Sequence, residues 1–177
     1  DGLLDSGVAY ELFLHNINTL PAGIVAQHIR GASESALPVL RDAWFDVVFV
    51  DADHAYASVV ADLTAARRLV ADGGVLCGDD LNVQWHECDT AYAVAHSGHD
   101  LVQDPATGRN FHPGVTRAVG ELFGAVSSWA GFWAVQRHGG DWRRFSLADM
   151  PIVFPDHFPP DAVDRAREHL RDLGPIA

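Results

Sequence analysis

Acidic side chains follow two predicted strands of this chain, at the point where each strand ends. Asp51 and Asp53 come directly after the apolar run 45–50, and Asp79 and Asp80 follow the next predicted strand. The carboxyl ends of neighbouring parallel strands lie at one edge of a sheet, about 5 Å apart, so these carboxylates are expected to crowd together. Like charges this close cannot all stay ionised without a counter-ion, and the chain has no Lys and no Arg in this cluster. The pattern therefore predicts a divalent cation with oxygen ligands, Mg²⁺ or Mn²⁺.

The same residues are open to other interpretations. Asp at a strand end often serves a turn or caps a helix: Asp53 is placed to cap a helix that begins near Ala55, and Asp80 to open a turn. A pair such as Asp51-x-Asp53 is also how nucleotide-sugar glycosyltransferases hold Mn²⁺ and a diphosphate. That second interpretation does not require the further acidic pair at 79–80.

Apolar periodicity and turn residues predict the elements that position these side chains. The predicted helices cover residues 8–17, 33–40, 55–72 and 161–173, and a further helix begins at Pro113. The predicted strands cover residues 24–29, 45–50, 74–78 and 128–135, and residues 142–147 are predicted to form a hairpin with the last strand. The run 45–50 is rich in β-branched and aromatic residues, which is typical of a parallel strand buried on both faces. Residues 45–78 therefore form a predicted β-α-β unit, and the fold class is α/β.

A long insert at residues 83–112 interrupts this alternation, and only 90–96 within it has a helical pattern. A segment of this length in a compact domain is usually a lid or a binding insert. Its His residues, which are His86, His96, His99 and His112, are expected to be solvated loop residues. His86 and Cys88 are spaced like half of a zinc site, but no second pair at ligand spacing accompanies them.

Composition excludes several classes of protein. The chain has 177 residues, of which 48% are apolar and 20% are charged. This length and composition predict one globular domain and exclude an intrinsically disordered chain. Twelve Arg against 24 acidic residues give a net charge of −12, which would repel a nucleic acid. No run approaches the ~20 apolar residues of a membrane span and no secretion signal is evident, so the expected location is the cytoplasm. Two Cys residues, Cys77 and Cys88, do not suggest a disulfide framework.

Four segments together resemble a known enzyme family. Residues 45–56, 69–76 and 78–80, with the later run 112–119, are similar to class I S-adenosylmethionine-dependent methyltransferases. The closest resemblance is to the small-molecule O-methyltransferase branch, which has phenylalanine-aspartate, hydrophobic residues and then aspartate-glycine-aspartate-histidine-serine-tyrosine in the first of these places. The resemblance extends over residues 8–136 and implies a Rossmann-like, doubly wound, mostly parallel sheet with helices on both faces.

The resemblance also implies roles for the strand-end residues. In metal-dependent members of the branch, the positions of Asp51, Asp79 and Asp80 hold Mg²⁺, which chelates the acceptor and lowers the pKa of its hydroxyl. A base three residues after the first of these takes the hydroxyl proton, and that position is His54, with Asp53 as its rival. The lid and acceptor pocket are expected at Trp85 and His86, where the alternative for Trp85 is a core aromatic residue.

The cofactor side of the resemblance is incomplete. The adenine side of S-adenosyl-L-methionine falls on Gly31, Ala32 and Ser33 after one predicted strand and on Asp51 and Ala52 after the next. The glycine-rich turn after the family's first strand and the acidic end of its second have no counterpart, so these N-terminal strands are expected in roughly 50 to 80 further upstream residues. A chain that truly lacked them would be a catalytically inactive methyltransferase-like module.

The expected organisation is a methyltransferase catalytic domain over residues 1–150 and a C-terminal extension over 151–177. The expected partner is a small-molecule hydroxyl acceptor, which is a sugar, a phenol or a natural-product intermediate, and no nucleic acid or membrane partner is expected. A homodimer is possible through the strand at 129–135 or the aromatic stretch 151–160.

Overall fold

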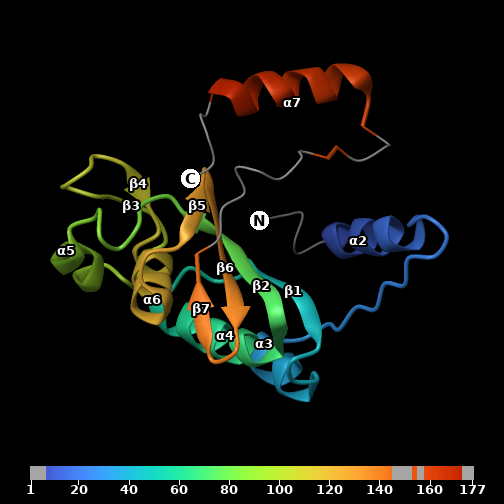
Figure 1. Cartoon of the computed structure of the whole chain (residues 1–177), viewed down its shortest axis with the longest axis horizontal. Coiled ribbons are helices and arrows are strands. Elements are labelled where there is room, and N and C mark those ends of the chain that lie inside the picture. Colours follow the sequence, from blue (N-terminus) through green and yellow to red (C-terminus); the bar gives the residue numbers. More distant parts are fainter. Residues whose placement is uncertain (1–6, 145–152, 155–157, 173–177) are drawn as a thin grey trace. The chain divides into compact units, whose positions relative to one another are not determined.

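A computed structural model of the protein describes residues 7–144, 153–154 and 158–172 (Figure 1). The chain divides into two compact units, Asp1–Ala32 and Ser33–Ala177, and each is described by itself. The predicted division after residue 150 lies outside the described residues, so it stays a prediction.

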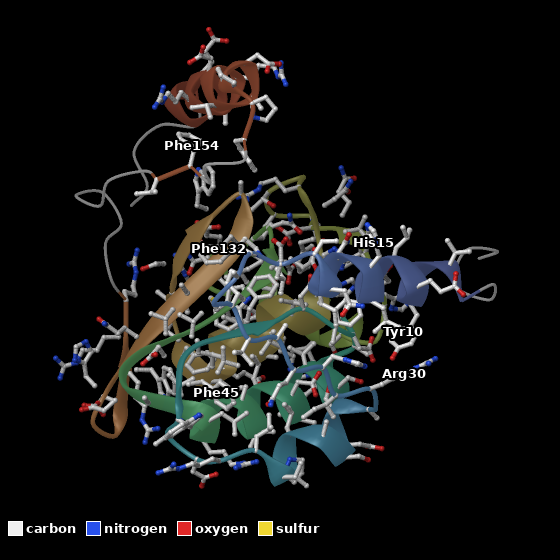
Figure 2. All side chains as sticks on the ribbon, turned by 90° about the vertical axis from the view of Figure 1, so that its right-hand side faces the viewer. Tyr10, His15, Arg30, Phe45, Phe132 and Phe154 are labelled. Carbon is white, nitrogen blue, oxygen red and sulfur yellow. The ribbon has the colours of Figure 1, made fainter. Side chains whose placement is uncertain are left out.

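The first unit consists of helix α2, Val8–Asn18, and an irregular segment after it. The predicted strand at 24–29 is wrong: Val25 and Ile29 are exposed and this segment pairs with no strand of the described residues. A β-branched apolar run forms a strand only where a neighbour can accept its backbone hydrogen bonds. Here side chains fix the segment instead, because the Tyr10 hydroxyl and His28 Nε2 lie 3.0 Å apart and the Arg30 guanidinium stacks on the Tyr10 ring (Figure 2).

The second unit is built on an open mixed sheet in the order β1-β2-β6-β5 (Figure 1). Its strands are β1 Phe45–Val50, β2 Val70–Leu81, β5 Ser127–Trp129, β6 Gly131–His138 and β7 Asp141–Arg143. The pair β1 and β2 is parallel, whereas β6 runs antiparallel to β2, β5 and β7. The predicted single strand at 128–135 is divided by a turn at Ala130, whose φ is 49°. The predicted hairpin partner corresponds to β7, and residues 145–147 lie outside the description.

Helices pack on the sheet through apolar stripes that the sequence spacing predicts. These helices are α3 Ser33–Ala36, followed by the 3₁₀ turn Leu37–Val39, then α4 Tyr56–Leu69 and α6 Pro113–Phe123. Leu63 from α4 and Val119 from α6 are buried in one cluster with Leu76 of β2 and Trp133 of β6. The predicted fold class is confirmed: the unit is α/β, with an open sheet and helices, consistent with a Rossmann-like methyltransferase fold.

Strand β1 differs from its prediction in burial. Val48 and Val50 pack against the core, but Val47 and Phe49 on the other face are 60% and 53% exposed. The expectation of burial on both faces is therefore wrong among the described residues. The reason is that β1 has one pairing partner there, and the core residues of α4 and α6 cover the face that carries Val48 and Val50. On the exposed face Phe49 stacks on Phe132, with ring centroids 6.5 Å apart.

The insert at 83–112 is a small structure of its own, with helix α5 Thr90–Ala95 as predicted and a hairpin of β3 Val102–Gln103 and β4 Asn110–Phe111. Val83, Ala93 and Phe111 form its core. Asp104 is fully buried because its carboxylate accepts hydrogen bonds from the amides of Asp89 and Thr107 and from the Thr107 hydroxyl, at 2.7 to 2.9 Å. These bonds join the insert into one unit.

Helix α7, Pro160–Asp172, confirms the predicted C-terminal helix, whose last predicted residue, Leu173, is outside the description. None of the helices in the described part of the chain has the length and apolar character required to span a membrane.

Candidate functional site

The carboxyl ends of β1 and β2 form the candidate site. Because these strands are parallel neighbours, the residues that follow them come to one edge of the sheet. One pocket at this edge is lined by five carboxylates and an imidazole, which belong to Asp51, Asp53, His54, Asp62, Asp79 and Asp80. Its apolar wall is made by residues of α4, α6 and β6, which include Leu63, Val115 and Trp133.

At this edge two imidazoles lie between two carboxylates. His54 Nε2 is 2.9 Å from one Asp80 oxygen, and His112 Nε2 is 3.5 Å from the other. On the opposite side of both rings, one oxygen of Asp100 lies 2.5 Å from His54 Nδ1 and 3.4 Å from His112 Nδ1. The ring centroids are 4.2 Å apart. Both Nε2 atoms therefore face Asp80 and both Nδ1 atoms face Asp100; we call these four residues the His–Asp cluster.

The carboxylates of the cluster change the proton affinity of His54. The hydrogen bond to Asp100 raises the pKa of His54, burial opposes this, and the charge of Asp80 adds to the increase. The same hydrogen bond lowers the pKa of Asp100. His112 is the more buried imidazole, with 12% of its side chain exposed, and its Nδ1 makes no hydrogen bond besides the long contact to Asp100. The cluster thus contains one imidazole, His54, that is held ready to bind a proton. The second imidazole, His112, is less exposed, and its Nδ1 has no hydrogen bond of normal geometry.

Backbone geometry explains why His112 reaches His54. Gly114 packs against the chain at the start of α4, so closely that a Cβ there would be 2.1 Å from the carbonyl oxygen of His54. Only glycine permits this approach, and it places His112, at the N-terminus of α6, beside His54. The expectation that His112 is a solvated loop residue is wrong for this reason.

Asp80 is held by an unusual conformation at the end of β2. Its φ is 67°, in the left-handed region, and the register with β6 shifts between Gly78 and Leu81. The preceding Asp79 accepts the Asp80 amide in a 2.9 Å hydrogen bond. A non-glycine residue in this region costs about 1–3 kcal/mol and persists only where the surroundings hold it. The bulge turns the Asp80 side chain toward the two imidazoles.

The structure places the three predicted metal residues, Asp51, Asp79 and Asp80, around one pocket, but the closest donor atoms belong to a different set. Asp51 and Asp79 line the pocket, but the group of donor atoms that lie within 4.8 Å of one another consists of His54, Asp80 and His112. Mg²⁺ prefers an all-oxygen shell, so this nitrogen-rich donor set does not fit it. Asp53, the rival base, accepts the Ala55 amide at 3.1 Å, and its hydrogen bond with Ser58 lowers its pKa. It therefore serves the turn before α4 and does not cap the helix, whose N-cap is Ala55 without a side-chain hydrogen bond.

The other predicted residues lie in several places. Trp85 packs against Gly120 of α6 and the core of the insert, which matches the alternative of a core aromatic residue, whereas His86 is exposed. Gly31 and Ala32 end the first unit, Ser33 begins α3 of the second, and Ala52 lines the pocket beside Asp51. Their contacts with a cofactor stay predictions.

Sequence reasoning missed two members of the cluster, Asp100 and His112. Asp100 is 46 residues from its partner His54, and no spacing rule connects them. His112 could have been suspected from the sequence, because it directly precedes Pro113 and Gly114, which begin α6.

Comparison with known proteins agrees with the fold. Residues 9–81 match a family model described as a methyltransferase domain, and this segment includes β1, α4 and β2 with the acidic residues at both strand ends. Neither the curated proteins nor the solved structures gave a significant match. The segment that is similar to a methyltransferase domain therefore contains the β1-α4-β2 unit whose strand-end residues line the pocket.

Proposed function

We propose that the protein transfers a methyl group from S-adenosylmethionine to a hydroxyl of a small molecule, which is a sugar, a phenol or a natural-product intermediate. The observation that carries this proposal is the His–Asp cluster, of which His54 and Asp80 line the pocket and lie in the segment that matches the methyltransferase model. Methyl transfer to oxygen requires a group that removes the hydroxyl proton. This cluster is the place in the described residues where two imidazoles and two carboxylates meet.

The side chains of the His–Asp cluster can accept the proton that this reaction releases. The acceptor oxygen attacks the methyl carbon, the carbon–sulfur bond breaks, and its electron pair stays on sulfur as a neutral thioether. The hydroxyl proton moves to His54 Nε2, which exchanges its 2.9 Å contact with Asp80 for the acceptor. Asp100 keeps the proton on Nδ1 through its 2.5 Å contact and so holds the ring with Nε2 toward the acceptor.

A divalent cation bound at this edge would lower the pKa of a coordinated hydroxyl and so assist the same proton loss. Mg²⁺ at Asp51, Asp79 and Asp80 is what the resemblance implies, but the donor atoms nearest to one another do not fit that ion. For the adenine end of the cofactor we propose Gly31, Ala32 and Ser33 with Asp51 and Ala52, as the sequence predicts.

Cofactor binding tests the proposal directly. Calorimetric titration with S-adenosylhomocysteine should show saturable binding, and methyl-labelled S-adenosylmethionine should label one of a panel of sugar, catechol and polyketide acceptors. Binding of a nucleotide sugar in place of S-adenosylhomocysteine would overturn the proposal in favour of a glycosyltransferase. If neither S-adenosylhomocysteine nor a nucleotide sugar binds, the protein is a methyltransferase-like module without this activity.

The residue test uses two histidines. His54→Ala should lower turnover while leaving the affinity for S-adenosylhomocysteine nearly unchanged, because His54 serves the acceptor. His138→Ala is the matched control, since His138 is exposed in the hairpin of β6 and β7 and lies outside the cluster. Equal turnover in the two variants would remove the base role from His54.

A further inference from the structure

We propose that His54, Asp80 and His112 bind a first-row transition-metal dication such as Zn²⁺, and that Asp100 orients both imidazoles from outside the coordination sphere. The site differs in residues and in preferred ion from the all-oxygen Mg²⁺ site expected from sequence. It goes beyond the proposed function at the edge of the same pocket, which His54 and Asp80 line: His54 Nε2 is the base in the metal-free protein and a ligand in the metal-loaded protein.

The distances suit a shared ion. Ligand atoms that lie about 2.0–2.2 Å from a dication are roughly 3–3.5 Å from each other. The contacts from Asp80 to the two Nε2 atoms are 2.9 and 3.5 Å, and the three residues each offer an atom within 4.8 Å of the others. The donors therefore already have the spacing of a coordination shell, and little movement is needed to admit an ion between them.

The tautomers also suit an ion. An imidazole that binds a metal through Nε2 almost always gives its Nδ1 proton to a carboxylate or carbonyl, which fixes the ring and raises its basicity. Here one oxygen of Asp100 faces Nδ1 of both His54 and His112, at 2.5 and 3.4 Å. With both Nδ1 atoms protonated toward Asp100, both Nε2 lone pairs point to the Asp80 side. The buried Nδ1 of His112 makes no hydrogen bond of normal geometry, and the atom that faces it is this same oxygen of Asp100.

Donor chemistry selects the class of ion. Two imidazole nitrogens and one carboxylate suit zinc, iron, cobalt or nickel, whereas Mg²⁺ keeps oxygen ligands and water. Three protein ligands leave further coordination positions for water or an oxygen of the acceptor. Burial of His54, Asp80 and His112 is intermediate, so the ion would be reached from the pocket without unfolding.

Metal binding to the whole chain tests this inference without cofactor or acceptor. After chelator treatment and dialysis, Zn²⁺ and Co²⁺ should each bind at one ion per chain by calorimetry, and Mg²⁺ should bind at least about 100-fold more weakly. X-ray absorption of the zinc-loaded wild type should show two imidazole nitrogens in the first shell. This spectrum needs no variant, so a variant that fails to fold does not leave the inference untested. A first shell of oxygen atoms alone would overturn it.

Variants separate this site from the all-oxygen one. His112→Ala should abolish tight Zn²⁺ binding, and Asp100→Asn should weaken it by about 10–100-fold as an outer-shell partner. His86→Ala, Asp51→Asn and Asp79→Asn should leave it unchanged. Loss of binding in Asp51→Asn with retention in His112→Ala would overturn the inference. Zinc binding without affinity for S-adenosylhomocysteine would refute the proposed function and leave the inference standing.

Discussion

Two groups of histidines in this molecule differ in what surrounds them. His54 and His112 lie between the carboxylates of Asp80 and Asp100, at the edge of the parallel strands. In the insert, His96 stacks on Tyr92 with ring centroids 3.9 Å apart, and its Nδ1 lies 2.8 Å from the carbonyl oxygen of the same residue. Among the described residues no carboxylate forms an ion pair with His96. A histidine is thus a candidate catalytic or ligand residue because of the charged groups around it. The number of histidines in the chain does not indicate such a role.

Loss of the carboxylate shared by both imidazoles should have the largest effect. Asp80→Asn keeps the shape and tolerates the left-handed backbone, but it removes the charge that faces both Nε2 atoms. We expect methyl transfer to fall by at least about 100-fold in steady-state assays, with the thermal unfolding midpoint little changed. Activity near the wild-type level would show that the cluster is not the reacting centre.

Comparison of His54→Ala with His96→Ala should sharpen the contrast between the two groups. We expect turnover to fall by about 10²–10⁴-fold in the first variant, as for loss of a general base or a ligand, and to stay within about twofold in the second. The measurement is kcat with labelled cofactor. A matching loss in both variants would mean that the carboxylate partners of His54 do not set its role apart from that of His96.

The backbone contact that joins the two imidazoles can be tested through stability. Gly114→Ala places a Cβ 2.1 Å from the His54 carbonyl oxygen, whereas a Cβ at Gly98 meets nothing within 4 Å. We expect Gly114→Ala to lower the free energy of unfolding by about 1–3 kcal/mol in urea titrations, and to lower activity further. Gly98→Ala is the control and should be nearly neutral. Equal stability of both variants would contradict the close packing at the start of α6.

The smallest effect is expected in the pH dependence of metal-free protein. The pKa of His54 is raised in the folded state, so its contribution to stability is fully present below its ordinary pKa near 6.5 and is lost as the pH rises through the folded value. Asp100→Asn removes the largest cause of the shift, so the pKa of His54 followed by NMR should move down. The decline of unfolding free energy with rising pH should also become shallower. A pKa that does not move would assign the shift to Asp80.

Local structure and the sheet edge at the ends of β1 and β2 could be predicted from the sequence. Contacts between distant segments could not be predicted. The unit β1-α4-β2 was predictable because its apolar periods are strong, although α4 ends at Leu69, before the predicted end at 72, and Gly73 and Gly74 lie within β2. The meeting of the acidic strand ends was predictable from parallel pairing. The strand at 24–29 was predicted from its apolar pattern, but no strand of the residues that the structure describes pairs with it. Asp100 could not be predicted, since it reaches His54 only through the fold of the insert.

The left-handed backbone at position 80 restricts how this edge of the sheet can be re-engineered. A saturation library there is expected to return soluble protein mainly for Gly, Asn and Asp, because β-branched and bulky side chains are penalised in that conformation whatever their chemistry. Redesign of acceptor or ion preference is therefore better directed at residues 100 and 112, where the main chain sets no such limit.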